Sequence, residues 1–276
     1  MKKSKNCNVG EPTTFIPFLK WAGGKRWLSD RIIQRVAHIK GRYIEPFLGG
    51  GAVFFALQPS ASLISDVNPE LINTYWAVRD DHEKVFSLLT SHHLAHSKEY
   101  YYQIRDYQPR CMYRKAARFI YLNRTCWNGL YRVNLNGKFN VPIGTKTSVL
   151  MPTDDWPKLS MLLRTAEIMC SDFEAAINQA EEGDLVFADP PYTVKHNLNG
   201  FIKYNDSLFS WSDQIRLRDA LLNAKRRGVK IIVTNAHHAS IKELYKRHFR
   251  LESISRTSVL ASSTVHRGVC EELLIS

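Results

Sequence analysis

Cysteines are few in this chain, and long hydrophobic segments are absent. The 276 residues contain five cysteines, an odd number, and no two of them form a C-x-x-C pair. This distribution argues against a disulfide framework and a cysteine-based zinc site, so we expect a reducing, cytoplasmic environment. No apolar run approaches the roughly 18 residues of a membrane helix. The basic start, Met1–Lys5, lacks the apolar stretch of a secretory signal. We therefore expect no membrane partner.

The chain also lacks a recognisable metal-binding motif. Three of the ten histidines lie close together, at His92, His93 and His96. No cysteine and no helical H-E-x-x-H pattern accompanies them. We predict that these histidines end a polar helix, and we expect no metal ion.

Acidic residues are outnumbered by basic ones. Lys and Arg total 38 and Asp and Glu total 26, which gives a net charge of +12 at pH 7. A charge of this sign fits a nucleic-acid-binding surface, and it also fits an ordinary basic protein. With 44% hydrophobic and 23% charged residues, the composition is that of a folded chain. The length suggests roughly two domains.

Strand and helix signals alternate in the first part of the chain. Residues 42–47 predict a strand, Gly49–Gly51 a turn and residues 52–57 a helix. The run Leu63–Asp66 predicts a second strand, and a capped helix follows from Glu70.

The same alternation returns towards the C-terminus. Residues 184–188 and 230–234 predict buried strands, and residues 211–226 between them predict an amphipathic helix. Residues 249–276 predict paired strands around Gly268. An alternation of this kind predicts an α/β fold.

Residues 75–150 have a different character, since Tyr, His and Arg dominate and strand signals are few. Residues 113–123 predict a helix with an apolar face. Residues 131–135 and 138–141 predict a β-hairpin, because Asn136-Gly137 favours a two-residue type I′ turn.

We therefore divide the chain into two parts. Residues 1–68 and 154–276 form the sheet domain, and residues 69–153 form a mostly helical insertion that carries the hairpin.

A glycine turn between a strand and a helix can bring a ligand close to the backbone. Gly49–Gly51 occupies such a position, although a simple tight turn has the same appearance. The third small residue of a dinucleotide fingerprint would fall at Phe54, which argues against a nicotinamide enzyme. Asp66 lies at a strand end, 17 residues after Gly49, where it can accept hydrogen bonds from two ribose hydroxyls. The alternative is that Asp66 caps the following helix.

The tetrapeptide Asp189-Pro190-Pro191-Tyr192 follows an apolar strand, where open α/β sheets bind their ligands. Asp189 and the carbonyl of Pro190 both accept hydrogen bonds, and Tyr192 offers a flat face. Together they fit a planar ring that bears an exocyclic amine. The alternative is a turn with a helix cap.

The segment 18–25 combines a tryptophan, a glycine pair and a lysine. Trp21 fits a stacking role, and Lys25 fits the binding of a carboxylate or phosphate. A surface turn before a helix is the alternative.

Six segments, taken together, resemble the Dam-like (D12 class) family of adenine-N6-specific DNA methyltransferases. They occur in the family's order: FLKWAGGK (18–25), EPFLGGGAVFF (45–55), SDVNPELINTY (65–75), YLN (121–123), NGLYRVNLNGKFNVPIG (128–144) and DPPY (189–192). The resemblance implies a Rossmann-like methyltransferase sheet with an inserted, mostly helical DNA-recognition domain. It also implies S-adenosylmethionine as the cofactor.

The resemblance also implies roles for individual residues. Catalysis falls to Asp189, Pro190, Pro191 and Tyr192. Cofactor binding falls to Trp21, Lys25, Glu45, Phe47, Gly49, Gly51, Asp66, Asp172, Phe173 and Asp189. For Asp172 a helix cap is an equal alternative.

The chemistry requires an adenine outside the double helix. Hydrogen bonds from the amine to Asp189 and to the Pro190 carbonyl favour a pyramidal nitrogen, whose lone pair then points at the methyl group. A base inside a duplex cannot reach such a pocket, so the enzyme must flip it out.

DNA recognition falls to the insertion. The expected DNA contacts are Arg124, Trp127, Asn128, Arg132, Asn134 and Lys138. Arg132 matches the family's base-reading arginine, and its alternatives are a phosphate contact or an exposed charge. Trp127 is either a wedge near the vacated base or part of the insertion's core. Thr125-Cys126-Trp127 departs from the commonest family pattern, so the resemblance leaves the target sequence open.

Two other functions stay open at this point. One is the same chemistry on cytosine N4, RNA or a protein amide. The other is a DNA-binding module without catalysis, with a decayed cofactor pocket. The expected partner is double-stranded DNA in a bacterial or phage context. A cognate restriction endonuclease is compatible with this reading, and nothing in the pattern requires an oligomer.

Overall fold

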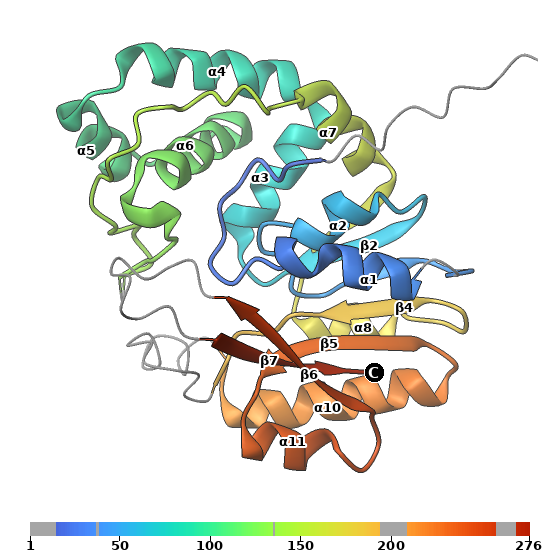
Figure 1. Cartoon of the computed structure of the whole chain (residues 1–276). Coiled ribbons are helices and arrows are strands. Elements are labelled where there is room, and N and C mark those ends of the chain that lie inside the picture. The colour runs from blue at the N-terminus through green and yellow to red at the C-terminus, as the bar shows by residue number, and fades with distance from the viewer. Residues whose placement is uncertain (1–14, 37–38, 135, 194–208, 258–268) are drawn as a thin grey trace, which may run out of the picture.

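One seven-stranded sheet forms the centre of the molecule (Figure 1). The computed structural model describes residues 15–36, 39–134, 136–193, 209–257 and 269–276. The strands are β1 (Tyr43–Glu45), β2 (Ser62–Asp66), β3 (Ala166–Cys170), β4 (Leu185–Ala188), β5 (Lys230–Ala236), β6 (Leu251–Thr257) and β7 (Val269–Ile275). Their order in the sheet is β3-β2-β1-β4-β5-β7-β6. The first five in this order run parallel, and β7 is antiparallel to both of its neighbours.

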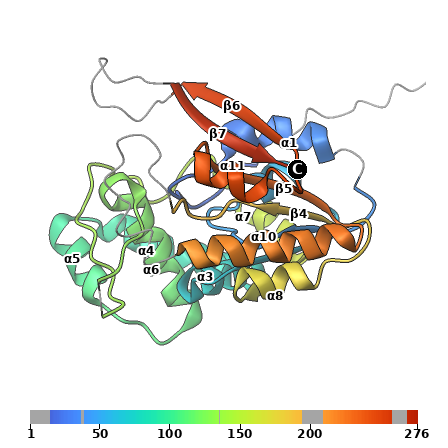
Figure 2. The ribbon, with the colours of Figure 1, turned by 90° about the horizontal axis from the view of Figure 1, so that it is seen from below.

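Helices cover both faces of this sheet (Figure 2). One face carries α8 (Phe173–Asn178), α10 (Trp211–Arg226) and α11 (Ala239–Tyr245). The other face carries α1 (Ser29–Val36), α2 (Ala52–Leu57), α3 (Pro69–Asp80) and α7 (Trp156–Arg164), with the short 3-10 helix η1 (Arg26–Leu28) before α1. Because both faces are covered, strand β4 is apolar throughout: Val186 and Ala188 face α10, while Leu185 and Phe187 face the other layer.

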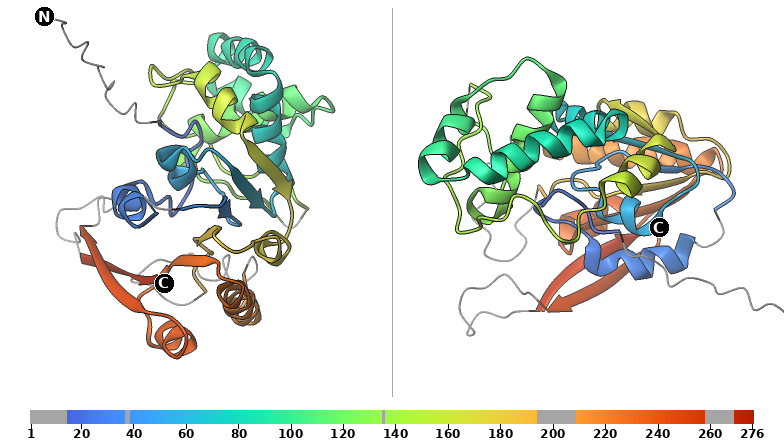
Figure 3. Two further views of the ribbon diagram at one scale, coloured as in Figure 1. Left: turned by 90° about the vertical axis from the view of Figure 1, so that its right-hand side faces the viewer. Right: turned by 90° about the horizontal axis from the view of Figure 1, so that it is seen from above.

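A second group of helices lies at one end of the molecule (Figure 3). It contains α4 (His82–Ala95), α5 (Lys98–Asp106), α6 (Met112–Thr125) and the 3-10 helix η2 (Trp127–Gly129). Helix α3 packs against α6 and also against β3, and the Trp76 indole donates a hydrogen bond to the Ile168 carbonyl (3.1 Å). One hydrophobic core therefore continues from the sheet into these helices.

The predicted α/β alternation is confirmed. The strands predicted at 42–47, 63–66, 184–188 and 230–234 correspond to β1, β2, β4 and β5, and the paired C-terminal strands correspond to β6 and β7. Gly268 lies outside the described residues. The predicted cap of α3 is also confirmed, since the Asn68 side chain accepts hydrogen bonds from the backbone of Glu70 and Leu71.

The predicted two-residue hairpin turn is wrong. Asn140 donates its N–H to the Arg132 carbonyl (3.1 Å) and Asn134 donates to Lys138 (2.9 Å), so three residues, not two, form the loop. Gly137 alone has a positive φ (71°) among the described loop residues, as a three-residue loop requires.

Asn134 is the physical reason for this loop. Its side-chain oxygen accepts the N–H groups of Asn136 and Lys138 (3.0 Å each), and its carbonyl accepts that of Gly137 (2.9 Å). Within the described part of this segment the paired strands reduce to one bridge, between Val133 and Phe139.

The clustered histidines bind tyrosines. His92 Nδ1 lies 2.8 Å from the Tyr100 hydroxyl, and His96 Nδ1 lies 2.8 Å from the Tyr121 hydroxyl. No group of three potential ligands that could hold a metal occurs among the residues described. Likewise, no described helix is both long and apolar enough to cross a membrane.

Arg124 was expected to bind DNA, and the structure instead buries it. Its side chain is 2% exposed and forms two hydrogen bonds of 2.6 and 2.7 Å with the carboxylate of Asp154. The remaining donors bind the carbonyls of Phe18 and Val149. Arg124 thus joins helix α6 to the segment before η1 and to the entry of α7, and no donor is left for a phosphate.

We predict that Asp154→Asn lowers the free energy of unfolding by about 3–5 kcal/mol, because it leaves the buried guanidinium of Arg124 without its counter-charge. Urea denaturation measures this change. The neighbouring Asp155→Asn is the matched control: Asp155 is the N-cap of α7, its side chain is 43% exposed, and Asn caps helices as well as Asp does. If Asp154→Asn and Asp155→Asn lower the free energy of unfolding equally, Arg124 and Asp154 do not form a stabilising buried ion pair.

Candidate active site

The chemically important side chains meet at one edge of the sheet. Glu45 ends β1, Asp66 ends β2, Asp189 directly follows β4 and Thr234 lies near the end of β5. These strands are neighbours in the order β2-β1-β4-β5 and run parallel. Their carboxyl ends therefore share an edge. Successive strands are added on one side of β1 up to β3 and then on its other side from β4, and open α/β sheets bind ligands at such a reversal of strand order.

Asp66 holds the glycine turn in place. Its two carboxylate oxygens accept the N–H groups of Gly49 and Asn68, each at 3.0 Å. The cap of helix α3 is Asn68, so the alternative role of Asp66 as the helix cap is wrong. Burial raises the pKa of Asp66, and the backbone hydrogen bonds oppose that rise.

The glycine turn is tightly enclosed. Gly49 and Gly51 have φ values of 48° and 65°, a region that favours glycine. A Cβ at Gly49 would lie 2.6 Å from Cδ1 of Trp21, so the indole lies directly against the turn. The Tyr75 hydroxyl donates to the Gly49 carbonyl (2.9 Å) from the other side. Trp21 itself stacks on Tyr131, with ring centroids 5.7 Å apart.

Asp189 is the centre of a second cluster. Its Oδ1 lies 2.9 Å from the Nζ of Lys25 and accepts a hydrogen bond of 2.6 Å from the Thr234 hydroxyl. The same Nζ donates to the Gly23 carbonyl (2.8 Å), lies 3.7 Å from Glu272 and lies 5.2 Å from the ring centre of Tyr192. Pro190 is buried, and Pro191 and Tyr192 are partly buried.

Sequence reasoning had not identified Thr234 and Glu272 as site residues. Thr234 belongs to the predicted strand 230–234, so its place at the carboxyl edge was the available signal. Glu272 had no such signal, because only the antiparallel pairing of β7 with β5 brings it to the edge.

Glu45 is a buried carboxyl group at the same edge. The Tyr43 hydroxyl donates a hydrogen bond of 2.8 Å to its Oε2. Burial raises the pKa of Glu45 to about 8, the Tyr43 hydrogen bond opposes this rise, and the negative charges of Asp189 and Asp66 add to it. Glu45 is therefore protonated near neutral pH.

Three phenylalanines pack together on the α8 side of the edge. Phe47 stacks on Phe173 (5.3 Å between ring centroids) and meets Phe209 edge-on (5.5 Å). Asp172 accepts the Glu174 N–H and pairs with Arg216 at 2.7 Å. It thus has the helix-cap geometry that was its alternative reading.

Apart from Arg124, which lies within α6, the residues expected to contact DNA follow that helix. Trp127 is 52% exposed, which excludes its alternative as a core residue. Asn128 is exposed and has a positive φ of 54°. Arg132 and Lys138 are exposed on either side of the three-residue loop, and Asn134 organises that loop. Arg124, as described above, is buried.

Asn123, within the YLN segment, joins the two groups of residues. Its side chain accepts the Lys20 N–H (2.8 Å) and donates to the Lys20 carbonyl (2.7 Å) and to the Gly129 carbonyl (3.3 Å). The segment that carries Trp21 and Lys25 is thereby attached to the turn that carries Trp127 and Asn128.

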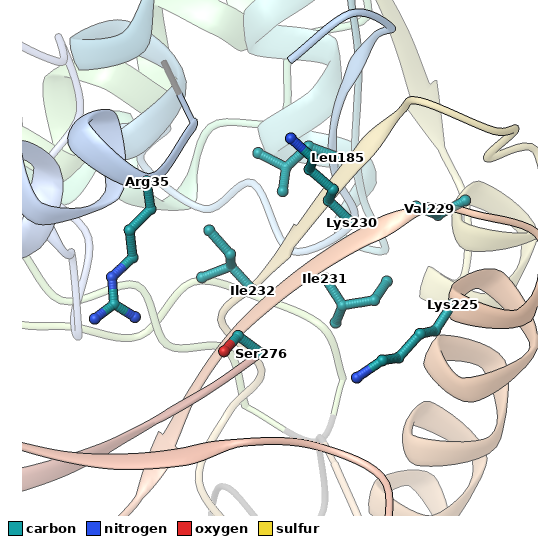
Figure 4. A pocket seen from close by; sticks show the side chains of 8 residues that line it. All are labelled: Arg35, Leu185, Lys225, Val229, Lys230, Ile231, Ile232 and Ser276. Atoms are coloured by element: carbon teal, nitrogen blue, oxygen red, sulfur yellow. The ribbon is translucent and has the colours of Figure 1, made fainter. Parts of the chain in front are cut away.

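A separate hollow of about 350 Å³ lies at the amino ends of β4 and β5 (Figure 4). Its charged lining includes Arg35, Lys225 and Lys230. Arg35 pairs with Glu252, and Lys225 donates to the His248 carbonyl. This hollow lies at the end of the strands opposite to Asp189, so it is not part of the clustered site.

The sheet order, the glycine turn with its strand-end acid and the Asp-Pro-Pro-Tyr loop define a doubly wound α/β protein with a ligand site at its switch point. Residues 21–260 match the model of a family described as D12 class N6 adenine-specific DNA methyltransferase. The chain belongs to this family.

Three curated relatives are each 36% identical to this chain. The type II methyltransferase M1.LlaDCHI of Lactococcus lactis subsp. cremoris aligns over 94% of this chain and 94% of its own length. The type II methyltransferase M.MjaIII of Methanocaldococcus jannaschii aligns over 94% and 98%. The DNA N-6-adenine-methyltransferase of Escherichia phage P1 aligns over 92% of this chain but only 34% of its own length. The chain is thus an adenine-specific DNA methyltransferase.

We predict that Glu45→Gln stabilises the protein increasingly as the pH rises. In the wild type the unfolded chain loses the Glu45 proton near pH 4.5, while the folded chain keeps it up to about pH 8. Folded wild type therefore loses stability between these values, by a few kcal/mol at about 1.4 kcal/mol per pKa unit. Denaturation of both proteins from pH 5 to pH 9 should show a difference that grows to pH 8 and then levels off.

The control for this measurement is Glu252→Gln. The hydrogen bond from Arg35 lowers the pKa of the Glu252 carboxyl. The contribution of Glu252 to the free energy of unfolding therefore changes below pH 5 and stays constant above pH 5. A pH-independent difference for Glu45→Gln as well would contradict the neutral state of Glu45.

Proposed function

We propose that this protein transfers a methyl group from S-adenosylmethionine to N6 of an adenine that has been flipped out of double-stranded DNA. The supporting observation is the meeting of two half-sites at one sheet edge. On one side of the switch point lie the glycine turn and Asp66, and on the other lies Asp189 with Pro190 and Tyr192. The first half-site suits the cofactor and the second suits the base.

The residues of the first half-site fit S-adenosylmethionine. Asp66 accepts hydrogen bonds from the backbone of Gly49, Asn68 and Val67, and a carboxylate offers about four acceptor sites. It retains an acceptor site for a ribose hydroxyl. Phe47 and Phe173 offer apolar ring surface for the adenine of the cofactor. When bound, S-adenosylmethionine supplies an electrophilic methyl group on a positively charged sulfur.

Five further residues border this half-site, and we keep their proposed role in cofactor binding: Trp21, Gly49, Gly51, Glu45 and Phe47. Lys25 changes its role within it. A lysine has three donors, and those of Lys25 face Gly23, Asp189 and Glu272. We propose that Lys25 holds the carboxylate of Asp189 in place through their ion pair.

Asp189 and the Pro190 carbonyl orient the target amine. Each accepts one N–H of the exocyclic amine, which turns the nitrogen lone pair towards the methyl group. Tyr192 stacks on the flipped adenine, which returns about 1–3 kcal/mol of the cost of flipping. In the transfer the bond from nitrogen to the methyl carbon would form as the bond from that carbon to sulfur breaks, which would leave a neutral thioether, and the nitrogen would pass its surplus proton to water.

Residues 69–153 supply DNA recognition in this proposal, and residues 1–68 and 154–276 supply catalysis. Trp127 is exposed at the start of the short helix η2, as a side chain that fills the space of the flipped base must be. Arg132 and Lys138 flank the loop held by Asn134, and Asn128 extends this surface. Arg124 is buried and is therefore not part of the proposed DNA-binding surface.

A restriction–modification role is a further part of the proposal. Two relatives are named type II methyltransferases. We infer that a restriction endonuclease of the same specificity accompanies this protein. DNA methylated by the chain should then resist cleavage by that endonuclease.

We predict that Asp189→Ala abolishes methyl transfer while DNA affinity changes little, because Asp189 holds the reacting amine and lies away from the phosphate contacts. The assay is a single turnover with tritiated S-adenosylmethionine and adenine-unmethylated genomic DNA. Titrations of both ligands accompany it. An active Asp189→Ala variant would remove this residue from the mechanism.

We predict that Arg132→Ala loses about 1–3 kcal/mol of discrimination at one base pair of the target, since a bidentate contact to guanine is worth that amount. Transfer rates on the preferred site and on its single-base variants measure the effect. Methylation of the preferred site should fall more than that of the site altered at this position.

Lys138→Ala is the control for a phosphate contact. It should weaken all sequences alike and reduce the salt dependence by about 0.9 in log–log slope, one phosphate's share. If Arg132→Ala behaves like Lys138→Ala, base reading belongs to another residue.

A further inference from the structure

The carboxylate of Asp189 is held by only one of its oxygens. Oδ1 accepts the hydroxyl hydrogen of Thr234 at 2.6 Å and lies 2.9 Å from Lys25 Nζ. No described residue donates to Oδ2. The terminal torsion of an aspartate has a broad, roughly two-fold preference, so without these donors the carboxylate plane would rotate. With them, Oδ2 keeps one direction.

Lys25 is in turn held from three sides. Its Nζ donates to the Gly23 carbonyl at 2.8 Å and lies 3.7 Å from the Glu272 carboxylate. The side chains of Lys25 and Glu272 are each 4% exposed. One buried ammonium group thus lies between two carboxylates, and Glu272 opposes its displacement towards Asp189.

Strand β7 gives Glu272 this position. β7 lies next to β5 in the antiparallel direction, and Glu272 pairs with Ala236, two residues after Thr234. The two positioning side chains therefore come from adjacent strands and reach the Asp189 loop from the sheet itself. Rigid strands hold such groups more accurately than loops do.

We propose that Thr234 and Glu272 are positioning residues for methyl transfer: Thr234 orients the Asp189 carboxylate directly, and Glu272 does so through Lys25, so that Oδ2 faces the target amine. This inference rests on the proposed role of Asp189. Preorganised acceptors of this kind lower the barrier because they do not have to reorient during the reaction.

The first test compares Thr234→Val with Thr234→Ser. Val keeps the shape of threonine and removes the hydroxyl, whereas Ser keeps the hydroxyl. A hydrogen bond to a charged group corresponds to roughly a 10-fold to 100-fold change in rate. We expect Thr234→Val to lower the single-turnover transfer rate by that factor, with unchanged dissociation constants for S-adenosylmethionine and genomic DNA. Thr234→Ser should restore the rate to within about threefold of wild type.

Thr74→Val is the matched control. Thr74 is a fully buried threonine whose hydroxyl donates to the Glu70 carbonyl within α3, and it has no contact with the Asp189 cluster. The Thr74→Val variant should transfer methyl groups at the wild-type rate.

The second test is a double-mutant cycle with Glu272→Gln. This change keeps an acceptor and removes the charge that opposes Lys25, so the rate should fall several-fold. Because both residues act on one carboxylate, Thr234→Val with Glu272→Gln should lose less than the product of the two single effects. If the rate losses of the two single variants multiply fully in the double variant, Thr234 and Glu272 do not act through the same Asp189 carboxylate, and the inference is overturned.

The outcomes separate this inference from the proposed function. If the wild type methylates adenine and Asp189→Ala does not, the proposed function stands, and a wild-type rate for Thr234→Val then overturns the inference alone. Equal losses in Thr234→Val and Thr234→Ser, or weakened cofactor binding in proportion to the rate, would assign Thr234 to packing and overturn it too. An active Asp189→Ala variant overturns the proposed function itself.

Discussion

Four parallel strands end at one edge of the sheet, and every functional group of the catalytic site depends on this geometry. Hydrogen bonds between β2, β1, β4 and β5 place the ends of segments that are far apart in the chain within a few strand spacings of each other. The reversal of strand order between β1 and β4 leaves room for a ligand there. The glycine turn and Asp66 stand on one side, and the Asp189 loop stands on the other.

The central sheet and the group of helices α4 to α6 are joined by buried polar contacts as well as by a shared core. Asn123 and Arg124 are consecutive on α6, and both bind backbone of the segment before η1. That segment carries Trp21 and Lys25, which border the two half-sites. These hydrogen bonds attach α6 directly to the segment that reaches the carboxyl edge of the sheet.

Four carboxyl groups lie at this edge, those of Glu45, Asp66, Asp189 and Glu272. Within the described part of the chain, Lys25 contacts two of them, Asp189 and Glu272. Burial keeps Glu45 neutral near pH 7 and raises the pKa of Asp66. The pairing with Lys25 prevents the Asp189 carboxylate from being left without a counter-charge in a partly buried place.

The sequence by itself determined the α/β class, the glycine turn, the strand-end position of Asp66 and the Asp-Pro-Pro-Tyr loop, because these depend on local patterns of apolar residues, glycines and prolines. It did not determine the register of the 131–141 loop, where the side chain of Asn134 overrode the Asn-Gly turn preference. Nor did it separate Arg124 from the exposed arginines, since burial depends on Asp154 thirty residues away. Only the tertiary structure decided that Thr234 and Glu272 meet Asp189. Strand pairing between distant segments brings them together, and no local pattern records which strands become neighbours.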